Sequence, residues 1–197
     1  MKQMGDQSIM VLKKVNSLLI NNEFEKALIL LENSLLTEEV RNECFGNYYY
    51  YKCDYEKAIE YYRRVLSFNP EYRLSRYQCL SGVGHEQLNE YEKAFRNYQE
   101  AIDIDPNFVD PYVELGALLT KVEAYDGAAT CFRDAIRITP DDLTLYFNLK
   151  SILEIKATGT PEDRKELAEI KIKIVDLESK GVKLPQKRQW QRYLAIV

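Results

Sequence analysis

Residues 109–142 read VDPYVELGALLTKVEAYDGAATCFRDAIRITPDD, and this stretch contains two apolar runs before a proline. In its first half, Leu115, Leu119 and Val122 recur at helical spacing. A second apolar run at helical spacing covers residues 125–135. Pro140 follows that run, and its ring blocks the hydrogen bond that would continue a helix. The stretch therefore predicts two helices followed by a turn.

The same pattern occurs two more times in the chain. Pro70, Pro106 and Pro140 are separated by steps of 36 and 34 residues. Four further columns share these two steps: Gly46, Gly82 and Gly116; Tyr55, Tyr91 and Tyr125; Ala58, Ala94 and Ala128; and Tyr62, Tyr98 and Phe132. Self-similarity at such a period is typical of repeat architectures. We therefore expect repeats at 39–72, 75–108 and 109–142, each a pair of helices.

Degenerate repeats flank these three. Phe24, Ala27 and Leu31 precede the matching second-helix positions of the next repeat by 31 residues, which predicts a helix pair over 8–38. Two further apolar runs after Pro140 predict a last pair over 143–179, which we interpret as a cap.

The connection inside this last pair has its own signals. Thr160 can cap the second helix and Pro161 can occupy its first position. Gly181 is expected to end that helix.

The repeats resemble tetratricopeptide repeats, whose pattern is W-x2-L-G-x2-Y, then A-x3-F, then P. Segment 109–142 matches it with Tyr112, Leu115 and Gly116, then with Ala128, Phe132 and Pro140. The resemblance implies an all-α fold over residues 1–179, a right-handed superhelix (α-solenoid) of stacked antiparallel helix pairs. It also implies a scaffold or adaptor for protein–protein interaction, which binds a peptide or helix of a partner protein in its concave groove.

The resemblance implies that the first helix of each pair lines this groove. Phe45, Gly46 and Tyr49 are expected to face the second helix instead. The residues expected to line the groove are Asn16, Glu43, Asn47, Tyr50, Tyr51, Arg76, Cys79, Val83, Gln87, Val113, Glu114, Ala117, Lys121, Phe147, Asn148 and Ser151. Amides there can bond a peptide backbone, and tyrosines give contact area with little loss of entropy.

Some tetratricopeptide proteins bind the acidic C-termini of heat-shock chaperones through a clamp of Lys, Asn, Asn, Lys and Arg. The five matching positions here are Leu12, Asn16, Cys44, Arg76 and Leu80. Only Asn16 keeps the residue type, and a register one repeat later matches worse. We therefore do not expect such a clamp.

Residues 180–197 form a basic segment with five bases and no acid, whereas the rest of the chain has 22 bases and 31 acids. Trp190, Tyr193, Leu194 and Val197 lie at i, i+3, i+4 and i+7, the spacing of an amphipathic helix. The residues expected to make contacts there are Lys187, Arg188, Trp190, Arg192 and Tyr193. Three roles stay open: a cap on the last pair, a segment that docks on a partner, or one that docks on the chain's own groove.

Composition narrows the class of function. The chain of 197 residues has a net charge of −4, which disfavours nucleic acid as a partner of the whole chain. No apolar stretch is long enough to span a membrane, and residues 1–6 lack the apolar core of a signal peptide. We therefore expect a cytoplasmic protein, with self-association and tail-mediated binding to RNA or an anionic membrane as alternative functions.

The sequence also contains no signature of a catalytic site or a metal site. Asp103 and Asp105, and likewise Asp141 and Asp142, flank prolines and are interpreted as turn and cap residues. His85 is the single histidine and occupies an aromatic position of the repeat, which indicates a packed, hydrogen-bonded side chain. The four cysteines are 9, 26 and 52 residues apart, with no CxxC motif, so we expect reduced thiols, no metal and no cofactor.

Overall fold

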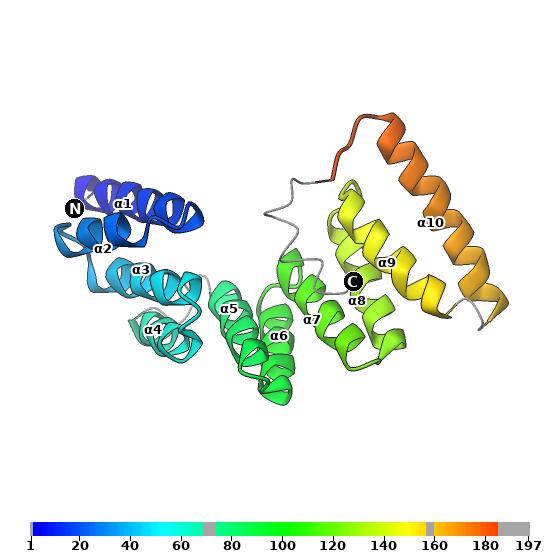
Figure 1. The fold of residues 1–197 in the computed structure, drawn as a ribbon, viewed down its shortest axis with the longest axis horizontal. Coiled ribbons are helices and arrows are strands. Elements are labelled where there is room, and N and C mark those ends of the chain that lie inside the picture. The colour runs from blue at the N-terminus through cyan, green and yellow to red at the C-terminus, as the bar shows by residue number, and fades with distance from the viewer. Residues whose placement is uncertain (1, 69–73, 157–159, 185–197) are drawn as a thin grey trace. The chain divides into compact units, whose positions relative to one another are not determined.

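The computed structural model describes residues 2–68, 74–156 and 160–184, which form ten helices and no strand (Figure 1). The helices are α1 (Lys2–Ile20), α2 (Phe24–Glu32), α3 (Glu38–Tyr51), α4 (Tyr55–Phe68), α5 (Leu74–Gln87), α6 (Tyr91–Ile104), α7 (Val109–Lys121), α8 (Tyr125–Ile138), α9 (Leu143–Lys156) and α10 (Pro161–Ser179). The predicted all-α helical repeat fold is confirmed. The hand of the superhelix stays a prediction.

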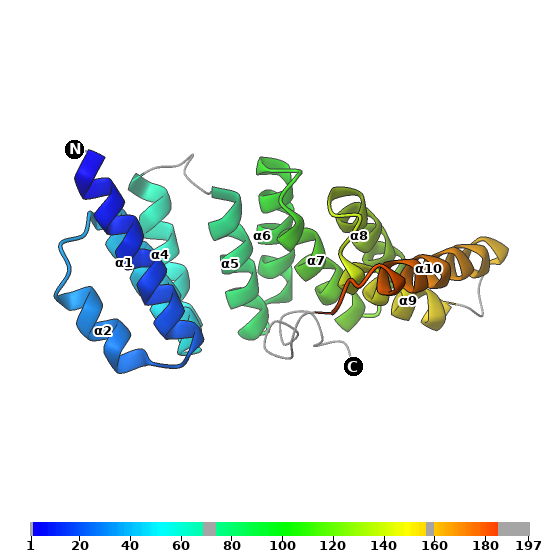
Figure 2. The same ribbon diagram turned by 90° about the horizontal axis from the view of Figure 1, so that it is seen from above.

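The chain divides into two compact halves, Met1–Asn97 and Tyr98–Val197, and the division falls within α6. In the N-terminal half, α1 packs against α2 (Figure 2) and also against α3, while α4 packs against α3 and α5. In the C-terminal half, α8 packs against α7 and α9, and α10 packs against α9. From α1 to α5 and from α7 to α10, successive helices are therefore neighbours in space, as a helical repeat requires.

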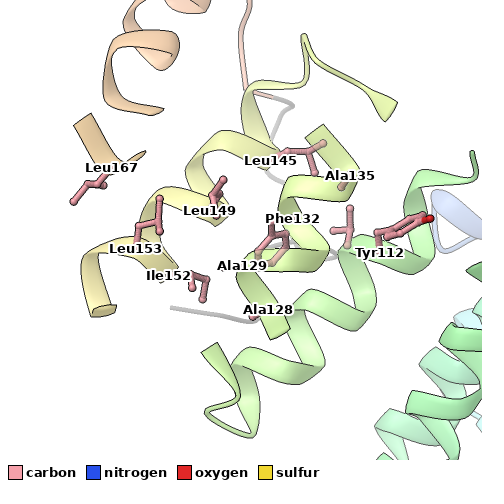
Figure 3. Packing of buried hydrophobic residues seen from close by; sticks show 11 residues of the cluster. Tyr112, Ala128, Ala129, Phe132, Ala135, Leu145, Leu149, Ile152, Leu153 and Leu167 are labelled. Atoms are coloured by element: carbon pink, nitrogen blue, oxygen red, sulfur yellow. The ribbon is translucent and has the colours of Figure 1, made fainter. Parts of the chain in front are cut away.

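The core of the C-terminal half brings together apolar side chains from α7, α8, α9 and α10. Figure 3 shows the ring of Phe132 among Tyr112, Ala129 and Leu149. Phe132 has no exposed surface, and neither do the alanines that precede it on α8. The repeated columns that include Ala128 and Phe132 are thus core positions, and Ala135 is buried beside them. Burial of such apolar surface is the main stabilising term, at roughly 25 cal/mol per Å².

Two helix glycines explain the glycine column. A Cβ placed on Gly116 would lie 2.9 Å from two ring carbons of Phe132, and one placed on Gly46 would lie 2.5 Å from Cε1 of Tyr62. The atoms nearest to the added Cβ at Gly116 belong to Phe132, so the glycine accommodates a large ring.

The turn inside each of the first four helix pairs holds one residue in the left-handed region. These residues are Asn22, Cys53, Asn89 and Glu123, with φ of 60°, 60°, 60° and 62°. In each turn the following amide donates to a carbonyl five residues back, as Ala124 N does to Leu119 O at 2.8 Å. This pattern is the Schellman motif, which usually has glycine at the left-handed position. Two asparagines suit the position, whereas Cys53 and Glu123 are strained there.

We expect Glu123→Gly to raise the free energy of unfolding by about 0.5–1 kcal/mol, because glycine removes the strain at φ 62°. Urea unfolding followed by circular dichroism measures the change. The matched control is Glu169→Gly, which places glycine at an exposed position inside α10 and is expected to lower stability by about 1 kcal/mol. Loss of stability in both variants would contradict the strain at position 123.

The start and the end of α10 follow the sequence signals. Thr160 Oγ1 accepts a hydrogen bond from Asp163 N at 3.1 Å, and Asp163 in turn accepts from Thr160 N, which makes a capping box with Pro161 at the helix start. Gly181 has φ of +81° just after the helix. The predicted cap, first position and stop of this helix are all confirmed.

Ion pairs join the helices of the C-terminal half. Arg133 on α8 donates from Nε and Nη2 to the two oxygens of Glu166 on α10, both at 2.7 Å. Lys156 Nζ lies 2.7 Å from Asp126 and 3.0 Å from Asp163. The bidentate geometry fixes the relative orientation of α8 and α10 more than a single contact would.

The four cysteines are free thiols, and only Cys53 is exposed. Burial, with a contribution from Glu43, raises the pKa of the Cys44 thiol to about 12. Burial, with a contribution from Asp134, raises the pKa of the Cys131 thiol to about 11. Both thiols therefore stay protonated in the folded chain well above their ordinary value of 9.0.

We expect iodoacetamide at pH 8 to label one thiol of the native chain, Cys53, and all four in urea, because the thiolate is the reactive form and needs access. Mass spectrometry of the digest counts the sites. Equal labelling of Cys44 and Cys53 in the native chain would contradict this burial.

Above pH 9 the unfolded chain releases protons that native Cys44 and Cys131 retain, so the free energy of unfolding is expected to fall as the pH rises.

Candidate functional site

The residues predicted to line a groove differ in how much surface they present. In the N-terminal half, Glu43, Asn47 and Cys79 are buried, and Gln87 is exposed. The half-buried ones there are Asn16, Tyr50, Tyr51 and Val83. The side chain of Arg76 and residues 185–197, with the predicted contacts Lys187, Arg188, Trp190, Arg192 and Tyr193, lie outside the described residues.

Two of the predicted groove amides bond each other. Asn47 Nδ2 donates to Asn16 Oδ1 at 2.9 Å, and Tyr62 OH donates to Asn47 Oδ1 at 3.1 Å. Asn47 therefore joins α1, α3 and α4 through side-chain hydrogen bonds. In this position it stabilises the stacking of neighbouring repeats, because a buried polar group needs a hydrogen-bond partner.

In the C-terminal half, the predicted residues lie on α7 and α9. We call them the α7–α9 face: Val113, Glu114, Ala117, Lys121, Phe147, Asn148 and Ser151. Val113 and Asn148 are buried, Lys121 is exposed, and the other four are half-buried. Val113 shares a core cluster with Leu145 and Leu149 of α9, so both helices contact the same core.

Asn148 is the unusual member of this face. The residue is only 6% exposed, yet its Nδ2 has no hydrogen-bond partner among the described residues. A buried amide donor that lacks a partner costs about 1–3 kcal/mol. A ligand that offers a carbonyl oxygen would remove this cost, and a peptide backbone offers one at every residue.

The five positions that match the chaperone clamp, Leu12, Asn16, Cys44, Arg76 and Leu80, do not form such a clamp. Leu12 and Cys44 occupy two clamp positions, and both are buried in the core of the N-terminal half. They cannot present a charge or an amide to a ligand.

His85 has the packed role that its position predicted. It is 7% exposed, and its Nδ1 lies 2.6 Å from Glu90 Oε2. Lys93 and His85 together lower the pKa of the Glu90 carboxyl. Asp105 and Asp142 likewise accept turn hydrogen bonds, from Asn107 N at 3.0 Å and Thr144 N at 2.9 Å.

In the part of the chain that the structure describes, no group of three or more His, Cys, Asp or Glu side chains could hold a metal ion. Nor does any described helix have the length and apolar character that crossing a membrane requires.

A repeated tyrosine contact was not predicted from the sequence. Tyr112 OH donates to Pro106 O at 3.1 Å, and Tyr146 OH donates to Pro140 O at 2.8 Å. Each tyrosine thus ties a helix to the proline turn before it. The signal was present in the sequence, since both pairs are six residues apart and the step between them is 34 residues.

An aromatic stack covers the junction of α3 and α4. Tyr61 stacks on Tyr49 and on Phe45, with ring centroids 5.4 Å apart in both pairs. Lys57 Nζ lies 5.0 Å from the ring centre of Tyr49, and Arg64 lies 4.9 Å from that of Tyr61. The predicted direction of Phe45 and Tyr49, toward the second helix of the pair, is confirmed.

Comparison with known proteins agrees with this architecture. A model of the tetratricopeptide repeat matches residues 44–72, and a second TPR repeat model matches residues 87–123. The DnaJ homolog subfamily C member 7 homolog of Dictyostelium discoideum is 25% identical over 137 residues, which are 68% of this chain and 25% of that protein. Stress-induced-phosphoprotein 1 of Caenorhabditis elegans is 27% identical over 128 residues, 61% of this chain and 38% of that protein. The chain therefore spans less than two fifths of either relative.

A solved structure shares the fold over most of its length. The structure titled "MamA RS-1 ArsTM double mutant" has a TM-score of 0.67 and 19% identity, and the match covers 90% of this chain and 98% of that one. At this identity the likeness shows the fold alone. The repeated columns, the helix pairs and the two repeat models lead to the same result: this chain contains tetratricopeptide repeats.

Proposed function

We propose that the chain is a non-enzymatic scaffold that binds a peptide or helix of a partner protein on the α7–α9 face. Tetratricopeptide repeats make the chain a protein–protein interaction scaffold. The observation that supports this face as the site is the buried Nδ2 of Asn148, which has no partner among the described residues. We place this interaction in the cytoplasm.

The chemistry of the face defines the partner's segment. Ala117 and Phe147 offer apolar contact, Asn148 offers a donor for a backbone carbonyl, and Glu114 carries one carboxylate. A segment with apolar side chains on one side and a basic residue beside them would complement this set. Because the first-register clamp positions Leu12 and Cys44 are buried, an acidic chaperone tail is not the partner we propose.

The test compares three baits in affinity capture from a cell lysate, read by mass spectrometry. Ala117→Arg adds a long charged side chain to the α7–α9 face, and Ala168→Arg adds the same side chain to the exposed surface of α10. We expect a partner to be retained by the unchanged chain and by Ala168→Arg, and lost from Ala117→Arg.

All baits must first show the same helical content and the same melting curve, so that loss of the partner reports the surface rather than unfolding. Equal recovery on Ala117→Arg and on the unchanged chain would contradict binding at this face and would direct attention to the other surfaces of the helices.

Self-association is a second candidate, supported by one observation on α10. Ile172 and Val175 are 70% and 64% exposed, one turn apart on the same helix. An apolar stripe of this kind can pack on a second copy of the chain. Light scattering after size exclusion tests it: a dimer that Ile172→Asp with Val175→Asp converts to a monomer would support self-association, whereas a monomer at all concentrations would contradict it.

A further inference from the structure

The described chain turns back after α10 and ends beside α9. Val182 N donates to Leu177 O at 3.1 Å across Gly181, which reverses the direction of the chain. Val182 and Leu184 then pack against a cluster that contains Leu143 and Tyr146 of α9. Phe147 packs against the same cluster. At Leu184 the chain therefore lies near the first two turns of α9, where the α7–α9 face includes Phe147.

This face offers contacts that a chain leaving Leu184 can reach. Phe147 is half-buried, and the next residue is Asn148, whose buried Nδ2 has no partner among the described residues. The neighbouring Ser151 Oγ donates back to Phe147 O at 3.0 Å, and no described acceptor, Ser151 included, takes the hydrogen bond of Asn148 Nδ2. The apolar ring and the amide donor thus belong to consecutive residues of α9, whose side chains leave the helix about 100° apart.

Residues 185–197 have the length to cover this face. As a helix these 13 residues would span about 20 Å, close to the roughly 21 Å of the 14-residue α9. In extended form they would reach about 45 Å. The segment needs no intervening linker, because its first residue follows Leu184 directly.

The charge of the segment complements the C-terminal half. Residues 185–197 carry the bases Lys187, Arg188 and Arg192 and no acid, whereas residues 98–184 carry seventeen acids and eleven bases. On α7, Asp110 and Glu114 are four residues apart, so they lie on one side of that helix. Attraction between opposite charges raises the local concentration of the segment at this surface.

We propose that residues 185–197 bind in cis to the α7–α9 face, with the aromatic side of the segment, Trp190 and Tyr193, against Phe147. A backbone carbonyl of the segment accepts the hydrogen bond of Asn148 Nδ2, and its bases lie toward Asp110 and Glu114. The proposal rests on the proposed function in one respect, since the segment occupies the face assigned to the partner. It therefore acts as a built-in competitor that a partner must displace.

Trp190 is the single tryptophan of the chain and reports directly on this contact. The test is acrylamide quenching of its fluorescence in the full chain and in a free synthetic peptide of residues 185–197. If most molecules hold the segment on the face, the quenching constant falls with the undocked fraction, by about threefold or more. Quenching as efficient as in the free peptide would overturn the proposal.

Two variants locate the contact. Phe147→Ala removes the ring, and Lys187→Glu with Arg188→Glu reverses two charges of the segment itself. Both are expected to restore quenching toward that of the free peptide, and the charge effect should weaken in high salt. Protection that survives both variants would overturn the proposal.

The exposed stripe of α10 is the matched control. Ile172→Asp with Val175→Asp is expected to leave Trp190 protected. If this double variant loses the protection while Phe147→Ala keeps it, the segment caps α10, and docking on α9 would be overturned. Protection that rises with protein concentration would show docking on a second copy and would likewise overturn the cis contact.

The outcomes separate this inference from the proposed function. If Trp190 is protected in a way that depends on Phe147 but no bait recovers a partner, the cis contact holds and the proposed binding of a partner protein fails. If the cis contact and the binding of a partner are both real, the bait carrying Lys187→Glu and Arg188→Glu recovers more partner than the unchanged chain, because its segment competes less for the face.

Discussion

Phe132→Ala is expected to lower the free energy of unfolding by about 3–5 kcal/mol, the largest loss among the single substitutions considered. The ring of Phe132 has no exposed surface and belongs to the cluster that joins α7, α8, α9 and α10 (Figure 3). Its removal leaves a cavity beside Gly116, which has no side chain to fill it. A domain of this size is stable by only about 5–15 kcal/mol, so the loss is a large part of the total.

Urea unfolding followed by circular dichroism measures this effect. Phe95→Ala is the control, because it removes the same ring from α6 at a position that is 41% exposed. We expect the control to change stability by less than about 1 kcal/mol, as is usual for surface substitutions. Equal losses in the two variants would contradict the central place of Phe132 in the core.

Gly46→Val is expected to destabilise the N-terminal half by about 3 kcal/mol through overpacking. A Cβ at Gly46 would lie 2.5 and 2.7 Å from two ring carbons of Tyr62. That ring is fully buried, and its hydroxyl donates to Asn47, so it has little freedom to move away. Valine also loses side-chain freedom in a helix, which adds a smaller cost.

A double-mutant cycle identifies the clash as the cause. Tyr62→Leu alone should destabilise, since it removes buried ring atoms and a hydrogen bond. Added to Gly46→Val, it should cost less than it does alone, because the smaller side chain leaves room for valine. Strict additivity of the two changes would show that the ring of Tyr62 is not what excludes a side chain at position 46.

The sequence predicted the helices well because their ends carry residues with strong local preferences. Proline steps of 36 and 34 residues placed the turns, and Thr160, Pro161 and Gly181 placed the limits of α10. These signals depend on backbone chemistry within a few residues. The left-handed turn positions were harder to see, because Cys53 and Glu123 give no sign that their φ is positive.

The candidate site was less predictable for a physical reason. Helical spacing gives the direction of a side chain but not how deeply a neighbouring helix covers it. Val113 and Cys79 were expected to line a groove, and both are buried. Asn16 and Asn47 were expected to meet a peptide, and they bond each other across α1 and α3. Such pairing across helices depends on how repeats stack, which no single repeat specifies.

The measurement that tests the α7–α9 face most directly is photo-crosslinking from position 121. Lys121 is exposed at the end of α7, so a benzophenone amino acid can replace it without entering the core. The same group at Ala168 on α10 is the control. In the purified chain, we predict crosslinks from position 121 to residues 185–197, and in a lysate additional crosslinks to a partner protein. If position 121 crosslinks to residues 185–197 and to a partner no more often than position 168 does, binding at the α7–α9 face would be contradicted.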